Sequence, residues 1–346
     1  MNKRVIVLLG GESTQCIAFA KAFSELGYSI VIVSEHSSSY SKSTVVNNEV
    51  ICAPHDFTER NLSALIGGTV ENVALILPME DIWQESFLKG FCDSTFAKLR
   101  PLIDIETLRT VANKRLLMQL ADDLDVPTPR TYTLKELQKY SDLDHKIIVK
   151  PVSDSGARGF VISSDTGTLI SGYDYLMERD GDALIQEYLP QDGRQFKYTA
   201  FCWDGVVISF SVIEKLEYFP VSGGSSVLCK AIVDSTVKHY ADEICHKVVW
   251  SGMIDFDFIE DVPGQRICLL EVNPRPPACV GVAFESGVNF AINFDELLSA
   301  PSQPTFTKFH PKRAIEYQYL TLRIFRLPFA FFRKEIRNNR TVHIIK

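Results

Sequence analysis

The sequence predicts an open parallel α/β domain at the N-terminus, followed by a larger mixed α+β region. Three observations lead to this fold class. The first hundred residues alternate short apolar strands with amphipathic helices, whereas the centre of the chain contains strand pairs separated by tight turns. The length of 346 residues also indicates two or three domains rather than one.

The N-terminal region begins with a buried strand. Val5–Leu9 is a continuous apolar run that ends at Gly10-Gly11, which is typical of a parallel strand covered on both faces. Helices are predicted over residues 13–26, 58–66 and 83–91, and further strands over residues 29–34 and 73–77. Short loops between these elements favour βαβ units in an open parallel sheet.

Two loops of this sheet are candidates for binding a ligand, because ligands of open parallel sheets bind beyond the carboxyl ends of the strands. These loops are Gly10–Thr14 and Pro78–Asp81. The two glycines resemble part of a dinucleotide fingerprint, but GxGxxG is absent, so a nicotinamide cofactor is not favoured. We expect this domain to help hold a substrate.

Composition argues against several classes of protein. The net charge of −7 argues against a general nucleic-acid binder, so no nucleic-acid partner is expected. Eight scattered cysteines without a CxxC pair, and seven dispersed histidines, indicate reduced core cysteines rather than disulfides or a zinc site. The chain has no apolar run of 18 residues, and its N-terminal run is too short for a signal peptide. We therefore expect a cytoplasmic protein.

The centre of the chain carries two lysines and a glycine-containing loop. A helix predicted over Thr107–Leu124 contains Lys114, and a strand then leads to Lys150. The loop Ser153–Gly159 follows, and its small residues could turn consecutive amide N–H groups onto an anion. The alternative interpretation of this loop is a tight hairpin turn.

Further strands follow this loop. Leu184–Leu189 is a short apolar strand in which Glu187 could accept hydrogen bonds from a ribose, while the backbone pairs with an adenine edge. Phe196–Trp203 and Val206–Val212 are predicted to form a hairpin around Asp204-Gly205. A helix is predicted over residues 234–250, ending near Gly252.

The segment Leu269–Pro277 carries three polar side chains at alternate positions, Glu271, Asn273 and Arg275. Alternate side chains of an extended segment point to one face. Carboxylate and amide oxygens are ligands that Mg²⁺ accepts beside phosphate oxygens, and an arginine suits a phosphate that develops charge. The strand Ile254–Phe258 could pair with this segment as a hairpin. By itself the segment is equally compatible with a buried polar patch before a proline-rich turn.

The order of these motifs resembles that of the ATP-grasp superfamily over roughly residues 105–300. The resemblance is closest to the carbamoyl-phosphate-synthetase-like carboxylate–amine ligases. It implies a Rossmann-like pre-ATP-grasp domain at residues 1–106 and an ATP-grasp domain at residues 107–300. The ATP-grasp domain would divide into subdomains at about residues 107–185 and 186–300, and residues 301–346 would pack on it as a basic segment.

The resemblance also implies which residues form an ATP site. The phosphates would be reached by Lys114 and Lys150, and the catalytic residues would be Lys150 and Arg275, the latter stabilising the transferred phosphoryl group. The loop over the phosphates would contain Ser155, Gly156, Ala157, Arg158 and Gly159. The hinge that holds adenine and ribose would contain Gln186, Glu187, Tyr188 and Leu189. The ligands of Mg²⁺ or Mn²⁺, expected as two ions, would be Asp257, Glu271 and Asn273; Gly252, five residues earlier, selects Asp257 over Asp255.

The sequence departs from the family pattern at two places. Gly193-Arg194-Gln195 stands where relatives often have Gly-x-Glu, so we expect a carboxylate contact to be missing there. Pro276–Cys279 lacks the run of small residues that usually follows Asn-Pro-Arg, so the resemblance does not define the acceptor pocket.

The implied activity is ATP-dependent joining of a small-molecule carboxylate to an amine. ATP would phosphorylate the carboxylate, and the amine would attack the acyl phosphate, with release of ADP and phosphate. One alternative is an enzyme that activates bicarbonate, as carbamoyl-phosphate and biotin-dependent enzymes do. Another is a catalytically silent ATP-binding sensor or partner subunit. The presence of both lysines, the metal ligands and Arg275 argues against a silent protein.

The C-terminal segment is basic and aromatic. Residues 310–346 hold nine Lys or Arg against two Glu, and Leu327–Phe332 lies among them. Such a segment could rest on an anionic membrane surface, which would make a lipid-linked carboxylate a natural substrate. The favoured interpretation is a strand over Arg313–Phe325 that returns to the ATP-grasp domain, followed by a short packed hairpin. The sequence leaves open whether the chain forms a homodimer.

Overall fold

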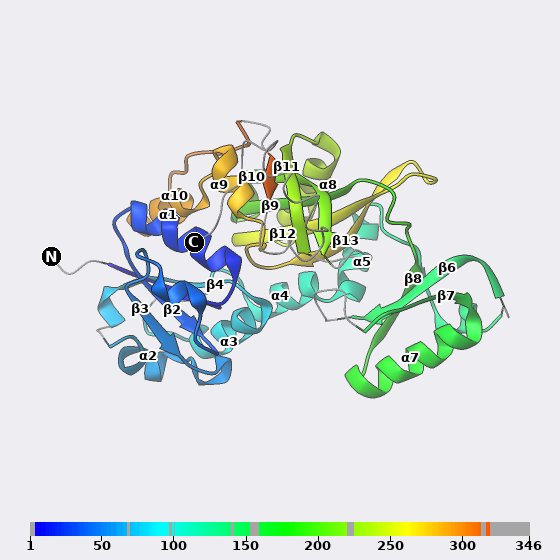
Figure 1. Cartoon of the computed structure of the whole chain (residues 1–346), viewed down its shortest axis with the longest axis horizontal. Coiled ribbons are helices and arrows are strands. Elements are labelled where there is room, and N and C mark those ends of the chain that lie inside the picture. Colours follow the sequence, from blue (N-terminus) through cyan, green and yellow to red (C-terminus); the bar gives the residue numbers. More distant parts are fainter. Residues whose placement is uncertain are drawn as a thin grey trace, which may run out of the picture.

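A computed structural model describes residues 4–67, 70–96, 99, 101–139, 142–152, 159–219, 225–312 and 316–318. It contains three β-sheets, which follow one another along the long axis of the molecule (Figure 1). One sheet is parallel and the next two are antiparallel, so the predicted fold class is confirmed. In the part of the chain described, no helix has the length and apolar character needed to cross a membrane.

The N-terminal sheet is parallel and has the strand order β3-β2-β1-β4. Its strands are β1 (Val5–Leu9), β2 (Ser29–Ser34), β3 (Asn48–Ile51) and β4 (Val73–Pro78). Its helices are α1 (Thr14–Glu25), α2 (Glu59–Ile66) and α3 (Asp81–Phe91), with 3₁₀ turns at Ser39–Lys42, Pro54–Asp56 and Val70–Asn72. The sequence does not predict β3, because Val50 is the one buried residue among its four.

Two helices connect this sheet to the rest of the chain. They are α4 (Ile105–Ala112) and α5 (Lys114–Asp123), where the sequence predicts one continuous helix. The helix breaks because Asn113 has an extended backbone, with ψ of 110°, and its side chain accepts hydrogen bonds from the N–H groups of Arg115 and Leu116. The break makes Lys114 the first residue of α5, where its side chain is buried.

The small antiparallel sheet has the order β5-β8-β6-β7. Its elements are β5 (Thr131–Tyr132), α6 (Leu134–Leu137), β6 (Asp142–Pro151), β7 (Val161–Asp165), α7 (Thr166–Asp180) and β8 (Ala183–Glu187). One face of the sheet packs on α7 (Figure 1). The sequence does not predict α7, because its apolar pattern is weak. Among its fifteen residues, the large apolar side chains that are buried are Leu169 and Leu176.

The large antiparallel sheet has the order β13-β12-β9-β10-β11-β14. Its strands are β9 (Gln195–Trp203), β10 (Val206–Phe219), β11 (Ser225–Ile232), β12 (Gly252–Asp261), β13 (Arg266–Asn273) and β14 (Glu316–Gln318). Asp204 and Gly205 join β9 to β10 with φ of 50° and 75°, the positive values that a two-residue type I′ turn needs.

The two faces of the large sheet have different roles. Alternate residues such as Tyr198 and Phe256 form a core with α8 (Ser235–Lys247). The residues between them, such as Lys197 and Asp257, point to the opposite face. That opposite face therefore carries the polar side chains of interest.

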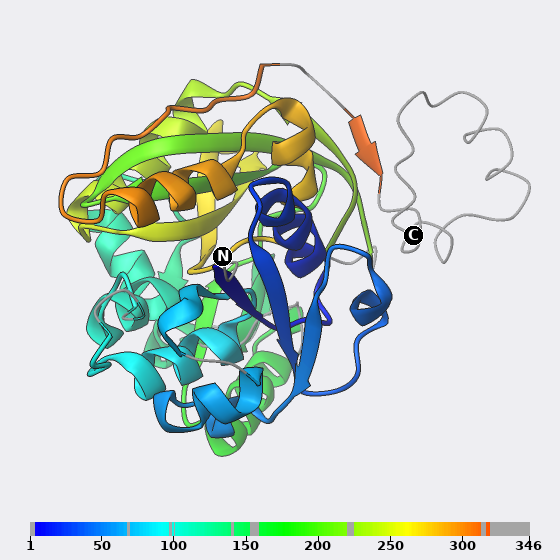
Figure 2. The ribbon, with the colours of Figure 1, turned by 90° about the vertical axis from the view of Figure 1, so that its left-hand side faces the viewer.

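The N-terminal sheet and the large sheet share one hydrophobic core. Two helices after β13, α9 (Gly281–Ser286) and α10 (Phe290–Ser299), close this core. Figures 1 and 2 show α10 beside α1 of the N-terminal region. The ring of Phe294 lies 4.9 Å from that of Phe201 on β9 and 6.2 Å from that of Phe23 on α1, measured between centroids. The two sheets thus contribute side chains to the same buried cluster.

We expect Phe294→Ala to lower the free energy of unfolding by about 3–5 kcal/mol, because the ring is 1% exposed and packs against both β9 and α1. The measurement is urea unfolding followed by tryptophan fluorescence. Tyr175→Ala, on α7 and 59% exposed, is the control and should leave the midpoint nearly unchanged. Equal midpoints for the two variants would contradict the shared core.

The C-terminal strand β14 pairs antiparallel with β11 at Leu228–Lys230. A strand is predicted over Arg313–Phe325, and its described part, β14, does return to the large sheet. Leu327–Phe332 and the rest of the basic segment lie outside the described residues. The membrane contact and the packed hairpin stay predictions.

Candidate functional site

Four polar side chains converge on the face of the large sheet opposite α8. In the register of β12 and β13, Asp257 lies opposite Glu271 and Asp255 lies opposite Asn273. Residues directly opposite each other in an antiparallel pair share a face. The three residues predicted to bind a metal, Asp257, Glu271 and Asn273, are therefore brought together, and Asp255 joins them.

Two lysines from neighbouring strands complete this cluster. Lys197 on β9 places its Nζ atom 2.6 Å from Asp255 Oδ2 and 2.5 Å from Asp257 Oδ2. Lys215 on β10 places its Nζ atom 2.7 Å from Asp257 Oδ1. The sequence analysis did not single out either lysine. The alternation of β9 could have placed Lys197 on the polar face, but not its contact with β12.

The charges in this cluster compensate one another. Burial opposes ionisation of Asp257, but the ammonium groups of Lys197 and Lys215 outweigh it and hold the pKa of this carboxyl well below its usual range. Burial likewise disfavours the charged form of Lys197, but Asp255 and Asp257 raise its pKa above the usual value. Burial raises the pKa of Asp255 to about 6, so this carboxyl becomes neutral before that of Asp257 as the pH falls. A buried ion pair of this kind is strongly destabilised when one partner is removed.

Lys114 and Lys150 lie beside Glu271. The Lys114 Nζ atom is 3.5 Å from Glu271 Oε2. The backbone N–H of Lys114 donates to the carbonyl of Val152, just after the end of β6, and this hydrogen bond ties the start of α5 to the strand that carries Lys150. Burial, followed by the charge of Lys114, lowers the pKa of Lys150 to about 8, although Glu271 acts in the opposite direction. The structure thus brings the two predicted phosphate lysines together.

With Lys150 as a predicted phosphate ligand, we expect the affinity for ATP to fall as the pH rises above about 8, because Lys150 then loses its proton and binding must restore it. Dissociation constants measured by calorimetry between pH 7 and 9.5, in buffers of different ionisation enthalpy, should reveal this proton uptake. Lys150→Arg keeps its charge and should remove the dependence. An affinity of the unmodified chain that is independent of pH over this range would contradict this account.

Protein stability should change in the opposite direction over the same range. The pKa of Lys150 in the folded chain lies below the value of roughly 10.4 for an exposed lysine. Between these two values the unfolded chain binds more protons, so this residue's contribution to folding stability rises with pH. Unfolding therefore does not account for the expected loss of affinity.

Arg275 links the polar cluster to the N-terminal sheet. Its Nε and Nη2 atoms donate to the two carboxylate oxygens of Asp81, at 3.1 and 3.0 Å, and Nη2 also donates to Asn273 Oδ1 at 3.2 Å. Asp81 belongs to the loop Pro78–Asp81 that was nominated for ligand binding. The other nominated loop, Gly10–Thr14, contacts the segment that follows β13, because the Thr14 hydroxyl donates a hydrogen bond to the carbonyl of Ala278 at 2.9 Å.

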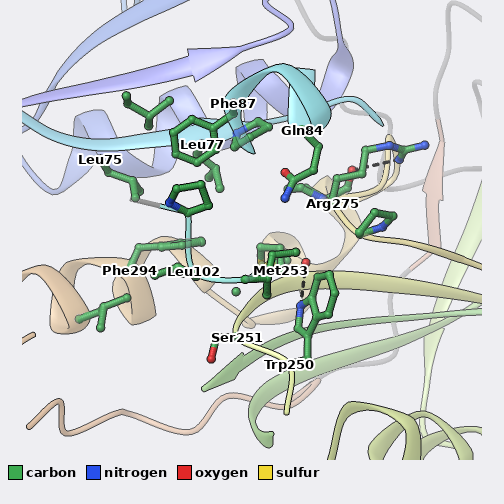
Figure 3. Close-up of a pocket in the computed structure, with 18 of the residues that line it drawn as sticks. Leu75, Leu77, Gln84, Phe87, Leu102, Trp250, Ser251, Met253, Arg275 and Phe294 are labelled. Carbon is green, nitrogen blue, oxygen red and sulfur yellow. Dashed lines mark hydrogen bonds between the residues drawn. The ribbon is translucent and has the colours of Figure 1, made fainter. Parts of the chain in front are cut away.

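A separate cavity of about 200 Å³ lies between the N-terminal sheet and β12. Figure 3 shows Leu77, Phe87, Met253 and Phe294 around it, while the guanidinium of Arg275 extends away from this apolar lining. Among the described residues that line the cavity, Arg275 is the ionisable one. The cavity therefore does not belong to the polar cluster.

The predicted hinge is held by hydrogen bonds to neighbouring segments. The Gln186 amide donates to Thr131 Oγ1 at 3.2 Å, and Glu187 Oε2 accepts from Arg266 Nη2 at 2.9 Å. The backbone N–H groups of Glu187 and Tyr188 donate to the carbonyls of Arg130 and Lys146. An adenine edge would therefore have to meet other groups of the hinge, near Leu189, which is buried against β12 and β13.

Most of the predicted phosphate loop lies outside the described residues, including Ser155, Gly156, Ala157 and Arg158. Gly159 is described and has φ of 67°. This positive φ favours glycine, whereas the nearest atoms to an added Cβ belong to the flexible end of Arg179.

The polar cluster offers some oxygen ligands of the kind that a divalent cation accepts. In the described part of the chain, no group of three or more His, Cys, Asp or Glu side chains could hold a metal ion alone. Glu271 and Asn273 offer a carboxylate and an amide oxygen, which suit Mg²⁺ together with phosphate oxygens. Both oxygens of Asp257 are within 2.7 Å of an ammonium group, so this predicted ligand is engaged otherwise.

Comparison with known proteins supports the fold. Residues 111–279 match the family model described as the ATP-grasp domain. The chain is similar to a 2-oxoglutarate carboxylase biotin carboxylase domain from Hydrogenobacter thermophilus, crystallised with MgADP, ADP and bicarbonate. The TM-score is 0.68 at 14% identity, over 89% of this chain and 72% of that chain. A search of curated proteins finds no match.

Two ligases of other kinds have similar structures. One is N5-carboxyaminoimidazole synthetase from Staphylococcus aureus complexed with ADP, with a TM-score of 0.68 at 13% identity, over 90% of this chain and 81% of that chain. The other is L-amino acid ligase from Bacillus licheniformis, with a TM-score of 0.63 at 13% identity, over 88% and 76% of the two chains. At these identities the similarities establish the fold and leave the substrates open.

Proposed function

We propose that the chain, of which residues 111–279 match the ATP-grasp domain model, is an ATP-dependent ligase that joins a carboxylate to an amine through an acyl phosphate. The observation that carries this proposal is the convergence of cations, carboxylates and an amide at one site. The cations are Lys114, Lys150, Lys197, Lys215 and Arg275, and the carboxylates are Asp81, Asp255, Asp257 and Glu271. Lysine and arginine side chains of this kind suit the phosphates of a nucleotide.

The proposed mechanism depends on positioning and charge. Lys114 and Lys150 would hold the phosphates, and Glu271 with Asn273 would hold Mg²⁺ or Mn²⁺, which neutralises phosphate charge when bound. Arg275, kept in orientation by Asp81, would stabilise the phosphoryl group during its transfer. The substrate carboxylate is the nucleophile toward ATP, so the reaction needs no nucleophilic side chain.

The acceptor amine would enter between the N-terminal loops and the segment after β13. This location is supported by the hydrogen bond from Thr14 to Ala278 and by the ion pair of Asp81 with Arg275. These contacts bring both nominated loops to the proposed site of phosphoryl transfer. Exclusion of water there would protect an acyl phosphate from hydrolysis.

A bicarbonate-activating enzyme is the second candidate, because biotin carboxylases are among the similar structures. A homodimer and the division into three domains stay predictions.

The experiment that tests the proposal is an ADP-release screen that crosses carboxylic acids with amino acids and other amines. We expect ADP to appear only when a carboxylate and an amine are both present. ADP release with bicarbonate alone would support the second candidate. Nucleotide binding without ADP release in any combination would support a silent ATP-binding protein.

A further inference from the structure

We propose that Lys197 is a built-in cation that takes the place of one of two divalent ions, so that the site binds a single ion with its nucleotide. This inference rests on the proposed function, since it concerns the same ATP site. It revises the expectation of two ions and removes Asp257 from the metal ligands. The single ion would be held by Glu271 and Asn273.

The first observation is the position of the Lys197 ammonium group. It bridges two carboxylates, with Nζ at 2.6 Å from Asp255 Oδ2 and 2.5 Å from Asp257 Oδ2. The ammonium group reduces the repulsion between the two carboxylates, as a divalent cation between them would. Asp255 is fully buried, and Asp257 and Lys197 are buried with relative exposures of 6% and 9%. The ammonium therefore acts as a fixed internal charge.

The second observation concerns the remaining oxygens of these carboxylates: Asp255 Oδ1 accepts a hydrogen bond, whereas Asp257 Oδ1 has an ionic contact without the geometry of a hydrogen bond. Asp257 Oδ1 lies 2.7 Å from the Nζ atom of Lys215, and Asp255 Oδ1 accepts a hydrogen bond from Thr199 at 2.8 Å. The amide of Asn273 donates to Asp257 Oδ2 at 3.2 Å. A metal ion that bound either aspartate would have to replace an ammonium or a hydroxyl group.

Displacement of Lys197 would be costly because of its place in the sheet. Lys197 lies on β9, which is flanked by β10 and β12. Its register partner on β12 is Asp257. A displaced ammonium group would remain buried without a counter-charge. Mg²⁺ also requires near-octahedral geometry and gives up its water reluctantly. The structure therefore favours the lysine over an ion at this position.

Glu271 differs from the two aspartates. Its side chain is 31% exposed, and its ion pair with Lys114 is long, at 3.5 Å. Asn273 Oδ1 accepts a hydrogen bond from Arg275 at 3.2 Å, and an amide oxygen has a second lone pair that could bind an ion. These two residues leave room for one ion bound jointly with phosphate oxygens and water, which is the usual manner of Mg²⁺.

The test is to count metal ions bound per bound nucleotide. Equilibrium dialysis of the full chain with Mn²⁺ and a non-hydrolysable ATP analogue, followed by metal and adenine analysis of both compartments, gives this ratio. We expect the compartment with the protein to hold an excess of one Mn²⁺ for each nucleotide bound to the chain. A ratio of two would overturn the inference while supporting the proposed function, and absence of nucleotide binding would contradict both.

A variant identifies the residue responsible. Lys197→Met removes the ammonium and frees both aspartates, so the ratio should rise to two. Lys230→Met is the matched control. Lys230 is the register partner of Glu214, so it lies on the face of the sheet opposite to that of Lys215. The ratio of metal to nucleotide in this control should stay at one. A folded Lys197→Met protein that still binds one ion would overturn the role of Lys197. If this variant does not fold, the ratio of the unmodified chain still decides.

Discussion

ADP release should fall to background, by roughly 1,000-fold or more, in Glu271→Ala and in Lys150→Ala. Glu271 would hold the one metal ion, and Lys150 would neutralise the phosphates within the same cluster. Each variant therefore removes one cation from the transferred phosphoryl group: the metal ion in Glu271→Ala and the ammonium group in Lys150→Ala. We expect no neighbouring side chain to take the place of either cation.

The control for this prediction is Glu243→Ala. Glu243 is on α8, which packs on the opposite face of the large sheet, and its side chain is 48% exposed. This variant should retain full activity, and circular dichroism should show that all three variants are folded. Undiminished turnover in Glu271→Ala or Lys150→Ala would contradict the proposed site.

Arg275→Ala is expected to lower kcat by about 100- to 1,000-fold, because it removes a cation beside the group being transferred. The affinity for nucleotide should change much less, since Lys114 and Lys150 remain. Steady-state kinetics together with nucleotide binding by calorimetry separates the two effects. A loss of affinity with kcat unchanged would instead assign Arg275 to ground-state binding.

Asp81→Asn distinguishes the charge of Arg275 from its orientation. The variant keeps the guanidinium but weakens the paired hydrogen bonds at 3.0 and 3.1 Å that hold it. We expect a loss of about tenfold in kcat, smaller than that of Arg275→Ala. Equal losses in the two variants would mean that Asp81 is itself required at the site, rather than acting through Arg275.

The local sequence was sufficient to predict the elements with a strong apolar pattern. β1 and β2 are continuous apolar runs, and the structure has them within the predicted bounds. β3 and α7 bury few large side chains, so their patterns are weak and tertiary contacts hold them in place. The break at Asn113 depends on a side-chain cap that competes with the helix, which apolar spacing does not reveal.

The candidate site was predictable where its residues share one strand or one hairpin. Glu271, Asn273 and their partner Asp257 follow from the alternation of two adjacent strands. Lys197 and Lys215 were missed because their contacts depend on the sheet order β12-β9-β10, which joins segments about 40 to 60 residues apart. For the same reason, sequence reasoning could not find the pairing of Asp81 with Arg275 across the two sheets.

The central claim is that the chain activates a carboxylate as an acyl phosphate. Hydroxylamine tests this most directly, because it reacts with an acyl phosphate as a general amine and gives a stable hydroxamate. With ATP, Mg²⁺, hydroxylamine and pools of carboxylic acids, we predict that at least one pool yields hydroxamate and ADP in equal amounts. Nucleotide binding without hydroxamate from any pool, or ADP release with bicarbonate alone, would contradict the claim.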